Sequence, residues 1–306
     1  MSATLFFAQA LNGIQLGVLL FLLAAGLTLV FGIMNFVNLA HGSLYMMGAF
    51  IAATLYNHTG SFLLSAVGVV VAMIAIGFLL DRIALSRLYD RDHLDQVLAT
   101  FGMILFFNEL TRIIWGPSPY NMQVPPMLEG TIDLFGIAYP LYRFMIIVVG
   151  LVVAAGCYLL IHKTRIGMLI RAGSSNRMMV GALGVNIRML NTLLFCLGAA
   201  LAGIAGLMAG PILSVQTGMG EPVLILTMVV IVIGGIGSVR GAFLAALIVG
   251  VVDTLGRSML PWILREVLSP SAANAAGPAI ASMLIYVMMA LILALRPQGL
   301  FPVRHG

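Results

Sequence analysis

The first apolar stretch of the chain, residues 10–33, reads ALNGIQLGVLLFLLAAGLTLVFGI and contains no Asp, Glu, Lys or Arg. A helix needs about 20 consecutive, mostly apolar residues to cross the hydrocarbon layer of a bilayer, which is ~30 Å thick. The stretch is apolar at most positions and does not alternate between apolar and polar residues, which indicates a helix and not a strand of a membrane barrel. It also lacks a basic flank on its N-terminal side, so we expect a permanent span and not a cleaved signal peptide.

Comparable apolar runs recur from one end of the chain to the other. Of the 306 residues, 61% are hydrophobic and 8% are charged, whereas a soluble domain carries about 25% charged residues. This composition excludes a soluble globular domain. We therefore predict an all-α, polytopic transmembrane bundle that forms a single domain over residues 1–306. Its nine predicted spans lie near residues 10–33, 39–57, 62–81, 95–115, 140–162, 189–211, 222–236, 241–259 and 275–295.

The number of spans depends on the segment 222–236, which is short for a full crossing. It is either a span, giving nine, or a broken or re-entrant half-helix, giving eight. A related feature is the similarity of GAFIAA at 48–53 to GAFLAA at 241–246. The similarity can reflect an internal duplication, which is common in transporters, or it can be coincidence in so hydrophobic a chain.

The charged residues between the spans predict an orientation, because basic loops stay on the cytoplasmic side. Residues 116–139 contain Glu129 and Asp133 but no Lys or Arg, so we expect an external loop there, ordered as a hairpin or cap. An external N-terminus and a cytoplasmic C-terminus follow. The basic positions that we assign to the cytoplasm are Arg82, Arg87, Arg91, Lys163, Arg165, Arg171, Arg177, Arg188, Arg296 and Arg304.

Polar residues interrupt the apolar pattern at Asn35, Asn38, His41 and Tyr45. On a helix, Asn38, His41 and Tyr45 are spaced i, i+3, i+7 and share one face. Polar side chains within a membrane must face a cavity or one another. These residues either line a substrate pathway, or Asn38 and His41 cap a helix junction by donating to free backbone carbonyls. The two roles are compatible.

A second interruption is GGIGSVRG at 234–241. Glycines in membrane helices serve close packing, but four glycines and an arginine in so short a stretch favour a broken helix that lines a pathway. We therefore assign Gly234, Gly235 and Gly237 to the substrate pathway. The spacing does not match the dinucleotide-binding fingerprint, and no strand precedes it.

The basic segment 163–188 differs from an ordinary connecting loop because seven apolar residues stand among its charges. We expect two short amphipathic helices there, broken at Gly173 and at Gly181–Gly184. Such helices either lie on the bilayer surface or dock into a soluble partner. The seven apolar residues, which we expect to be exposed, are Met168, Leu169, Ile170, Met178, Met179, Val180 and Leu183.

Four segments together resemble the LivH-type permeases of branched-chain amino acid ATP-binding cassette (ABC) importers. In chain order they are GLTLVFGIMNFVNLAHGSLYMMGAF, RIGMLIRAGSSNRMMVGALGVNIRMLNTLLFCLGAALAGIAG, VIVIGGIGSVRGAFLAALIVGVVDTL and LRPQGLF. The resemblance implies a multi-pass protein of the bacterial inner membrane. It also implies partners: a second homologous permease subunit or a copy of this chain, two ATP-binding subunits, and a periplasmic substrate-binding protein.

The resemblance further implies that residues 167–187 form a cytoplasmic coupling segment that seats in a groove of the ATPase. Gly173-Ser174-Ser175 and Met178-Met179 depart from the family pattern within this segment. The positions to which we assign ATPase coupling are Arg171, Asn176, Met179, Leu183 and Gly184.

The chain itself has no GxxxxGK[ST] phosphate-binding loop, because its only lysine, Lys163, lacks the preceding glycine. We therefore expect no enzyme activity and no cofactor or metal of its own, with ATP used by the partner subunits and no role for nucleic acid. The expected function is import of a hydrophobic or branched-chain amino acid, or of a related small amide, urea or organic acid.

Two other functions compete with an importer subunit. An autonomous secondary transporter or channel would need its own coupling-ion site, and Asp253 is a candidate that Arg257, four residues later, neutralises. An intramembrane enzyme would need a catalytic motif, and neither HExxH nor GxSxG occurs in the sequence.

Overall fold

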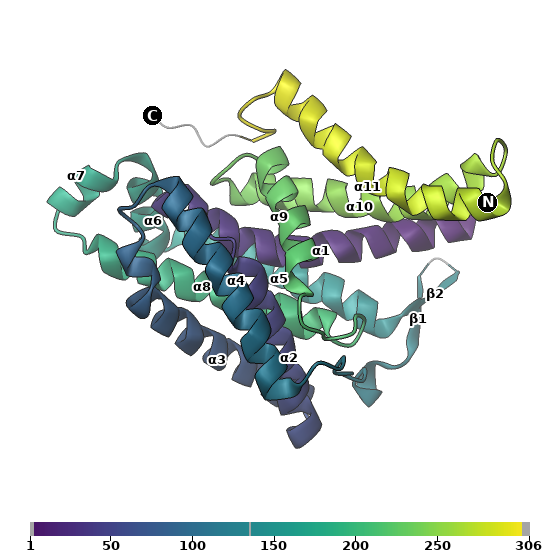
Figure 1. Ribbon diagram of the computed structural model, residues 1–306, viewed down its shortest axis with the longest axis horizontal. Coiled ribbons are helices and arrows are strands. Elements are labelled where there is room, and N and C mark those ends of the chain that lie inside the picture. Colours follow the sequence, from purple (N-terminus) through teal and green to yellow (C-terminus); the bar gives the residue numbers. More distant parts are fainter. Residues whose placement is uncertain (1–2, 135, 302–306) are drawn as a thin grey trace.

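The computed structural model describes residues 3–134 and 136–301, and this part of the chain is almost entirely helical (Figure 1). Arg304, which was assigned to the cytoplasmic tail, lies outside the described residues. The prediction of an all-α bundle is confirmed. The helices are α1 (Ala3–Met34), α2 (His41–Thr59), α3 (Phe62–Ile83), η1 (Leu85–Arg87), α4 (His93–Trp115), η2 (Pro126–Leu128), α5 (Leu141–Lys163), α6 (Arg165–Ser175), α7 (Arg177–Ala182), α8 (Ile187–Ala209), α9 (Gly220–Gly234), α10 (Val239–Leu264) and α11 (Pro270–Leu295).

A helix occupies each of the nine segments in which the sequence predicts a span. Seven of these helices are long and apolar enough to cross a membrane: α1, α3, α4, α5, α8, α10 and α11. As expected from its sequence, α9 is short: its 15 residues cover about 22 Å at 1.5 Å per residue. The remaining helix, α2, begins with polar residues and is buried along most of its length.

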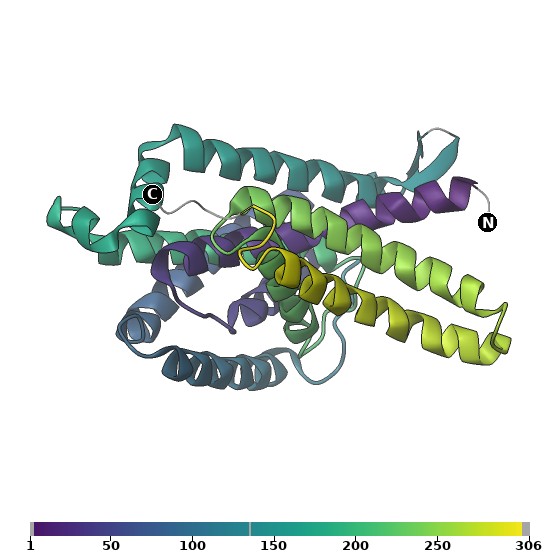
Figure 2. The same cartoon turned by 90° about the horizontal axis from the view of Figure 1, so that it is seen from above.

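Helix α1 lies in the middle of the bundle and packs against α10, α8, α5 and α9 (Figures 1 and 2). Glycines bring it into direct backbone contact with its neighbours. A Cβ atom on Gly26 would lie 2.8 Å from the Cα of Gly198 in α8, and one on Gly17 would lie 2.7 Å from the carbonyl oxygen of Ala246 in α10. Small residues allow this approach, and van der Waals packing replaces the hydrophobic effect between helices in lipid.

The two ends of the molecule carry different elements. Helices α6 and α7 lie at one end of the long axis, whereas the β-hairpin and the turn between α10 and α11 lie at the other (Figures 1 and 2). The basic connection after α3 lies at the α6–α7 end, because Tyr89 packs edge-on against Phe36, just beyond α1, with ring centroids 5.5 Å apart. The basic segments therefore share one end, as the predicted orientation requires.

The segment 116–139 contains the expected hairpin, built from β1 (Thr131–Leu134) and β2 (Ile137–Pro140). The strands are antiparallel, with Thr131 opposite Pro140. The hairpin is attached to α1 at Asn12, whose Oδ1 accepts hydrogen bonds from the Tyr139 hydroxyl at 3.2 Å and from Arg143 at 2.7 Å. Burial raises the pKa of Tyr139 to about 12, so this donor keeps its proton at neutral pH.

One detail of the sequence interpretation needs correction. The predicted helix break at Gly173 is wrong, because α6 continues through Gly173 and ends at Ser175. The break falls at Asn176, whose Oδ1 accepts the backbone N–H of Met179 at 2.9 Å and so caps α7. A glycine inside a helix costs only about 1 kcal/mol, whereas an asparagine at this position satisfies a free N–H group.

The similar sequences GAFIAA and GAFLAA lie at different places in their helices. GAFIAA occupies the middle of α2, whereas GAFLAA lies near the start of α10. An internal duplication therefore stays a prediction.

The glycine contacts generate a test of the packing. A Cβ atom on Gly48 of α2 would lie 2.4 Å from the Cα of Gly203 in α8, whereas one on Gly102 of α4 would meet no atom within 4 Å. Gly48→Ala should lower the thermal unfolding midpoint of the detergent-solubilised protein, since overpacking costs about 1–3 kcal/mol. Gly102→Ala should leave it unchanged or raise it, because alanine is the better helix former. Equal midpoints in the two variants would show that α2 and α8 are not in backbone contact.

Candidate functional site

Two helices, α2 and α9, begin inside the bundle and not at one of its ends. The chain reaches them through the non-helical segments 35–40 and 210–219. Their first turns touch: a Cβ atom on Gly220 of α9 would lie 2.2 Å from the carbonyl oxygen of Gly42 in α2. The positive ends of two helix dipoles therefore lie together within the protein. Discontinuous helices with this arrangement form the binding sites of many transporters.

Asn35 and Asn38 shape the first of the two non-helical segments. Asn35 follows the end of α1 with a φ of 48°, a left-handed conformation that asparagine tolerates better than most residues. The Oδ1 atom of Asn38 accepts the backbone N–H of Ala40 at 3.0 Å. Its Nδ2 atom is buried without a hydrogen-bond partner among the described residues. Asn38 thus helps to cap the junction, but it accepts a hydrogen bond where we expected it to donate one.

The predicted helical face of Asn38, His41 and Tyr45 is only partly correct. Asn38 precedes the helix, because α2 begins at His41. His41 and Tyr45 lie one turn apart on α2, and both are fully or almost fully buried. The His41 ring lies 3.1 Å from where a Cβ atom on Gly26 would be. Its ring nitrogens form no well-aligned hydrogen bond in the described structure, and the backbone group beside them is that of Leu23, within α1 and away from the junction. His41 therefore does not cap the junction through its side chain.

Helix α4 supports both non-helical segments with polar side chains that the sequence analysis missed. Oε1 of Gln96 accepts the backbone N–H of Val37, and the Thr100 hydroxyl oxygen accepts that of Leu39, each at 3.3 Å. Without these partners, the backbone amides between α1 and α2 would be unpaired inside the bundle. The available signal was the recurrence of Gln, Thr, Asn and Thr on one face of an apolar span, at residues 96, 100, 108 and 111.

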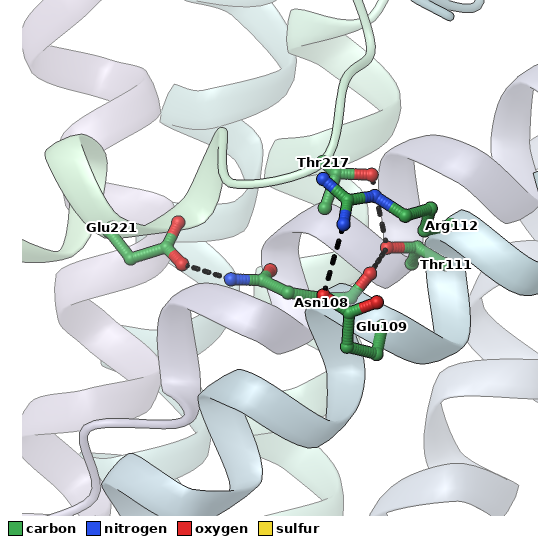
Figure 3. A network of polar contacts seen from close by, with 6 residues as sticks. All are labelled: Asn108, Glu109, Thr111, Arg112, Thr217 and Glu221. Atoms are coloured by element: carbon green, nitrogen blue, oxygen red, sulfur yellow. Dashed lines mark hydrogen bonds and ion pairs between the residues drawn. The ribbon is translucent and has the colours of Figure 1, made fainter. Parts of the chain in front are cut away.

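The same face of α4 holds the start of α9 (Figure 3). The Asn108 amide donates to Oε1 of Glu221 at 2.6 Å, and the hydroxyls of Thr111 and Thr217 lie 3.4 Å apart. Glu221 lies in the first turn of α9, where a negative charge interacts favourably with the helix dipole. Its second carboxylate oxygen is buried without a hydrogen-bond partner in the described part of the chain.

The ion pair expected between Asp253 and Arg257 from their i, i+4 spacing is confirmed, and a second pair, at i, i+3 spacing, joins Glu109 and Arg112. Arg112 lies 3.2 Å from Glu109, and both side chains are exposed (Figure 3). Arg257 lies 2.8 Å from Asp253, whose side chain is buried.

A further buried acid was missed by the sequence analysis: Asp81, at the end of α3, accepts hydrogen bonds from the hydroxyls of Tyr89 and Thr192. Because Asp81 lies beside Arg82 at the end of a predicted span, its sequence position does not distinguish it from the charged residues of a loop.

The glycines of the second interruption form the junction between α9 and α10. Helix α9 ends at Gly234, and Gly235 and Gly237 have φ values of 100° and 83°, so the predicted break in the helix is confirmed. The segment after α11 fills this junction, because Phe301 donates its backbone N–H to the carbonyl oxygen of Gly234 at 3.1 Å. Gly237 also lies directly against Gly32 of α1.

The basic segment forms α6 and α7, and only some of its apolar residues are exposed. Met178 and Leu183 are 86% and 76% exposed, and Met179 is also exposed. Ile170 and Val180 are buried, contrary to expectation, because α6 packs against α5 and α7 packs against α8. Helix α7 ends before Gly184, which has a φ of 88°. Met168 of α6 is also exposed, as expected, but three of the exposed apolar side chains lie on α7 and the turn that follows it.

A cavity of about 580 Å³ connects the predicted pathway to the predicted coupling segment. It lies between the ends of α1 and α5, helix α6 and the segment 236–240. Asn35, Gly237 and Arg171 line it, whereas Asn38, His41, Tyr45, Gly234 and Gly235 do not. The guanidinium group of Arg171 donates to the carbonyl oxygen of Ile161 at the end of α5.

The polar network of Figure 3 offers a matched test of buried against exposed carboxylates. Glu221→Gln should lower the free energy of unfolding by about 1 kcal/mol, because it removes the charge from the hydrogen bond with Asn108 and from the helix start. Glu109→Gln should change it less, because exposed ion pairs contribute about 0–1 kcal/mol. Denaturant unfolding in detergent would compare them. A larger effect at Glu109 would contradict the assigned network.

Comparisons with known proteins agree with this architecture. The sequence model of the family described as branched-chain amino acid transport system / permease component matches residues 9–293. The permease protein BraD of the high-affinity branched-chain amino acid transport system of Pseudomonas aeruginosa is 28% identical, over 95% of this chain and 94% of its own length. The corresponding LivH protein of Salmonella typhimurium is 29% identical, over 86% of this chain and 90% of its own.

A more distant relative is the ribose import permease protein RbsC of Escherichia coli, which is 25% identical over 75% of this chain and 71% of its own length. No solved structure matches the chain significantly. The family match covers every predicted span except the last residues of α11 and includes both broken helices. The chain is therefore a multi-pass membrane protein that belongs to the family of branched-chain amino acid transport permeases.

Proposed function

We propose that the chain is the permease subunit of an ABC importer that carries a hydrophobic or branched-chain amino acid, or a related small amide, urea or organic acid, into the cytoplasm. ATP hydrolysis on two separate subunits drives the transport. A periplasmic binding protein delivers the substrate, and a second permease subunit, homologous or identical, completes the membrane part. The protein lies in the inner membrane with its N-terminus on the periplasmic side and its C-terminus in the cytoplasm.

The observation that carries this proposal is the exposed apolar surface of α7, which we define as Met178, Met179 and Leu183. These side chains are exposed at the basic end of the molecule, and Arg177 and Arg188 flank them. Methionine side chains adapt well to partner surfaces. The Asn176 cap fixes the start of α7, and Gly184 ends it. We assign α7 to the contact with the ATP-binding subunit, with Arg171 attaching α6 to the end of α5.

The broken helices support the proposed pathway. Opening between Gly42 and Gly220 would expose the first turns of α2 and α9, whose free N–H groups suit the carboxylate of an amino acid. Asn38 and His41 lie beside this junction with buried polar atoms that lack well-aligned hydrogen-bond partners in the described structure. We assign Asn35, Asn38, His41, Tyr45, Gly234, Gly235 and Gly237 to the pathway and to the hinges beside it.

The alternative, an autonomous secondary transporter or channel, would need a free acid within the membrane. Asp253 is paired with Arg257, and both carboxylate oxygens of Asp81 accept hydrogen bonds from hydroxyls. Glu221 is hydrogen-bonded to Asn108 through one carboxylate oxygen and forms no ion pair among the described residues. The family match therefore favours the importer subunit more strongly than these pairings do.

The coupling assignment predicts a specific loss of function. Leu183→Asp places a charge on the exposed apolar surface of α7 and should reduce substrate-stimulated ATP hydrolysis of the assembled importer at least tenfold, while the protein still inserts and folds. Leu183→Met keeps an apolar side chain and should retain most of the activity. Undiminished stimulation in Leu183→Asp would show that the ATP-binding subunit docks elsewhere.

The pathway assignment predicts that His41→Ala slows transport. The His41 ring lies between α2 and Gly26 of α1, so its removal should disturb the movement of α2 against α1. Initial uptake rates into proteoliposomes, normalised to folded protein, would measure the effect. His58→Ala, an exposed histidine near the end of the same helix, is the matched control. Normal uptake by His41→Ala would limit His41 to filling space.

A further inference from the structure

The cavity between the end of α1 and helix α6 is strongly basic. The side chains of Arg171, Arg177 and Arg240 line it, and no Asp or Glu is among its lining residues. Among the described residues these three arginines form no ion pair, because the two ion pairs found there lie elsewhere. Like charges that share a cavity repel one another, so an anion between them would lower the electrostatic energy.

The arginines retain capacity to bind such an anion. Arg240 donates to the Tyr158 hydroxyl at 3.1 Å and stacks over the Tyr158 ring, both neutral interactions. Arg177 has no hydrogen-bond partner in the described structure. Each guanidinium group carries five N–H donors in a planar fork that matches phosphate or carboxylate oxygens. Three guanidinium groups carry more N–H donors than the two oxygens of a single carboxylate can accept. A phosphate group has more acceptor oxygens and suits them better.

Other donors point to the same kind of ligand. The hydroxyl of Thr28 in α1 lines the cavity, is completely buried and has no hydrogen-bond partner in the described part of the chain. A buried hydroxyl without a partner is costly. The first turn of α10 also reaches the cavity through Val239 and Arg240, and helix starts present free N–H groups to anions.

The rest of the cavity wall is mostly apolar, with Asn35, His162, Ser174 and Ser238 as its other polar residues, and such a wall suits an amphipathic ligand. Its apolar lining residues are Leu29, Phe31, Met34, Ile161, Ile170, Ile236 and Val239. A volume of about 580 Å³ leaves room for glycerol and the first carbons of acyl chains beside a phosphate group. Basic pockets between membrane helices are known to bind anionic lipid headgroups.

We propose that this cavity binds a phosphate ester, and that its ligand in the membrane is the headgroup of an anionic phospholipid. The phosphate group lies among Arg171, Arg177 and Arg240, and one of its oxygens accepts a hydrogen bond from the Thr28 hydroxyl. The bound lipid joins the end of α1, the α9–α10 junction and α6. The site does not depend on the identity of the transported substrate.

The test is direct binding to the full chain purified in a neutral detergent. Native mass spectrometry would measure the affinities for dioctanoyl phosphatidylglycerol, dioctanoyl phosphatidylcholine and inorganic phosphate. Phosphatidylglycerol should bind at least tenfold more tightly than phosphatidylcholine. Arg177→Gln should weaken phosphatidylglycerol binding about five- to tenfold, since each arginine near an anionic headgroup contributes about that much. Arg165→Gln, on the preceding helix α6 and outside the cavity lining, is the charge-matched control and should change the affinity less than twofold.

A second variant separates binding from folding. Thr28→Val keeps the side-chain shape, should leave the thermal midpoint of the lipid-free protein unchanged or raised, and should weaken phosphatidylglycerol binding. If inorganic phosphate binds and Arg177→Gln weakens its binding as much as that of phosphatidylglycerol, the site belongs to a soluble phosphate ester. If phosphatidylglycerol binds and inorganic phosphate does not, the site belongs to lipid. Full phosphatidylglycerol affinity in both Arg177→Gln and Thr28→Val, or equal binding of phosphatidylcholine, would overturn the proposal.

Discussion

Direct contact between helix backbones is the constraint on which the rest of this structure depends. Lipid tails are as apolar as the side chains of the helices, so a side chain gains little free energy by moving from lipid to a contact between helices. Helices in a membrane must therefore attract one another through close packing. Glycine removes the side chain at the contacts, as Gly26 does against Gly198 and Gly48 does against Gly203. Helix α1 can therefore lie at the centre with backbones on several sides, and α2 can lie against α8.

Close packing also makes it possible for α2 and α9 to begin inside the bundle. A helix that starts within a membrane leaves unpaired N–H groups, which lipid cannot satisfy. Here the two starts touch at Gly42 and Gly220, and one polar face of α4 satisfies the segments that lead to them. The result is a polar site enclosed by protein, in which buried groups such as the Asn38 amide retain unused hydrogen-bonding capacity.

The polar site and the exposed surface of α7 are joined through the end of α1. Asn35 ends α1 and lines the same cavity as Arg171 of α6, and Gly237 of the α9–α10 junction lines it as well. A displacement of α6 by a partner would therefore reach the junctions of both broken helices. In the proposed function this is the physical route by which ATP hydrolysis outside the membrane opens a path within it, and an anionic headgroup in the cavity would lie on that route.

The sequence alone determined the helical class and the places of all nine predicted helices, because apolar runs of sufficient length have no other stable form in a bilayer. It also identified the break at 234–237, since the glycines there permit positive φ values. Only the tertiary structure decided that Asn38 precedes α2, that Ile170 is buried, and that Gln96 and Thr100 support the junction. Those outcomes depend on neighbours far away in the chain. The recurring polar residues of α4 indicate a polar face on that helix, but they do not show which backbone groups that face contacts.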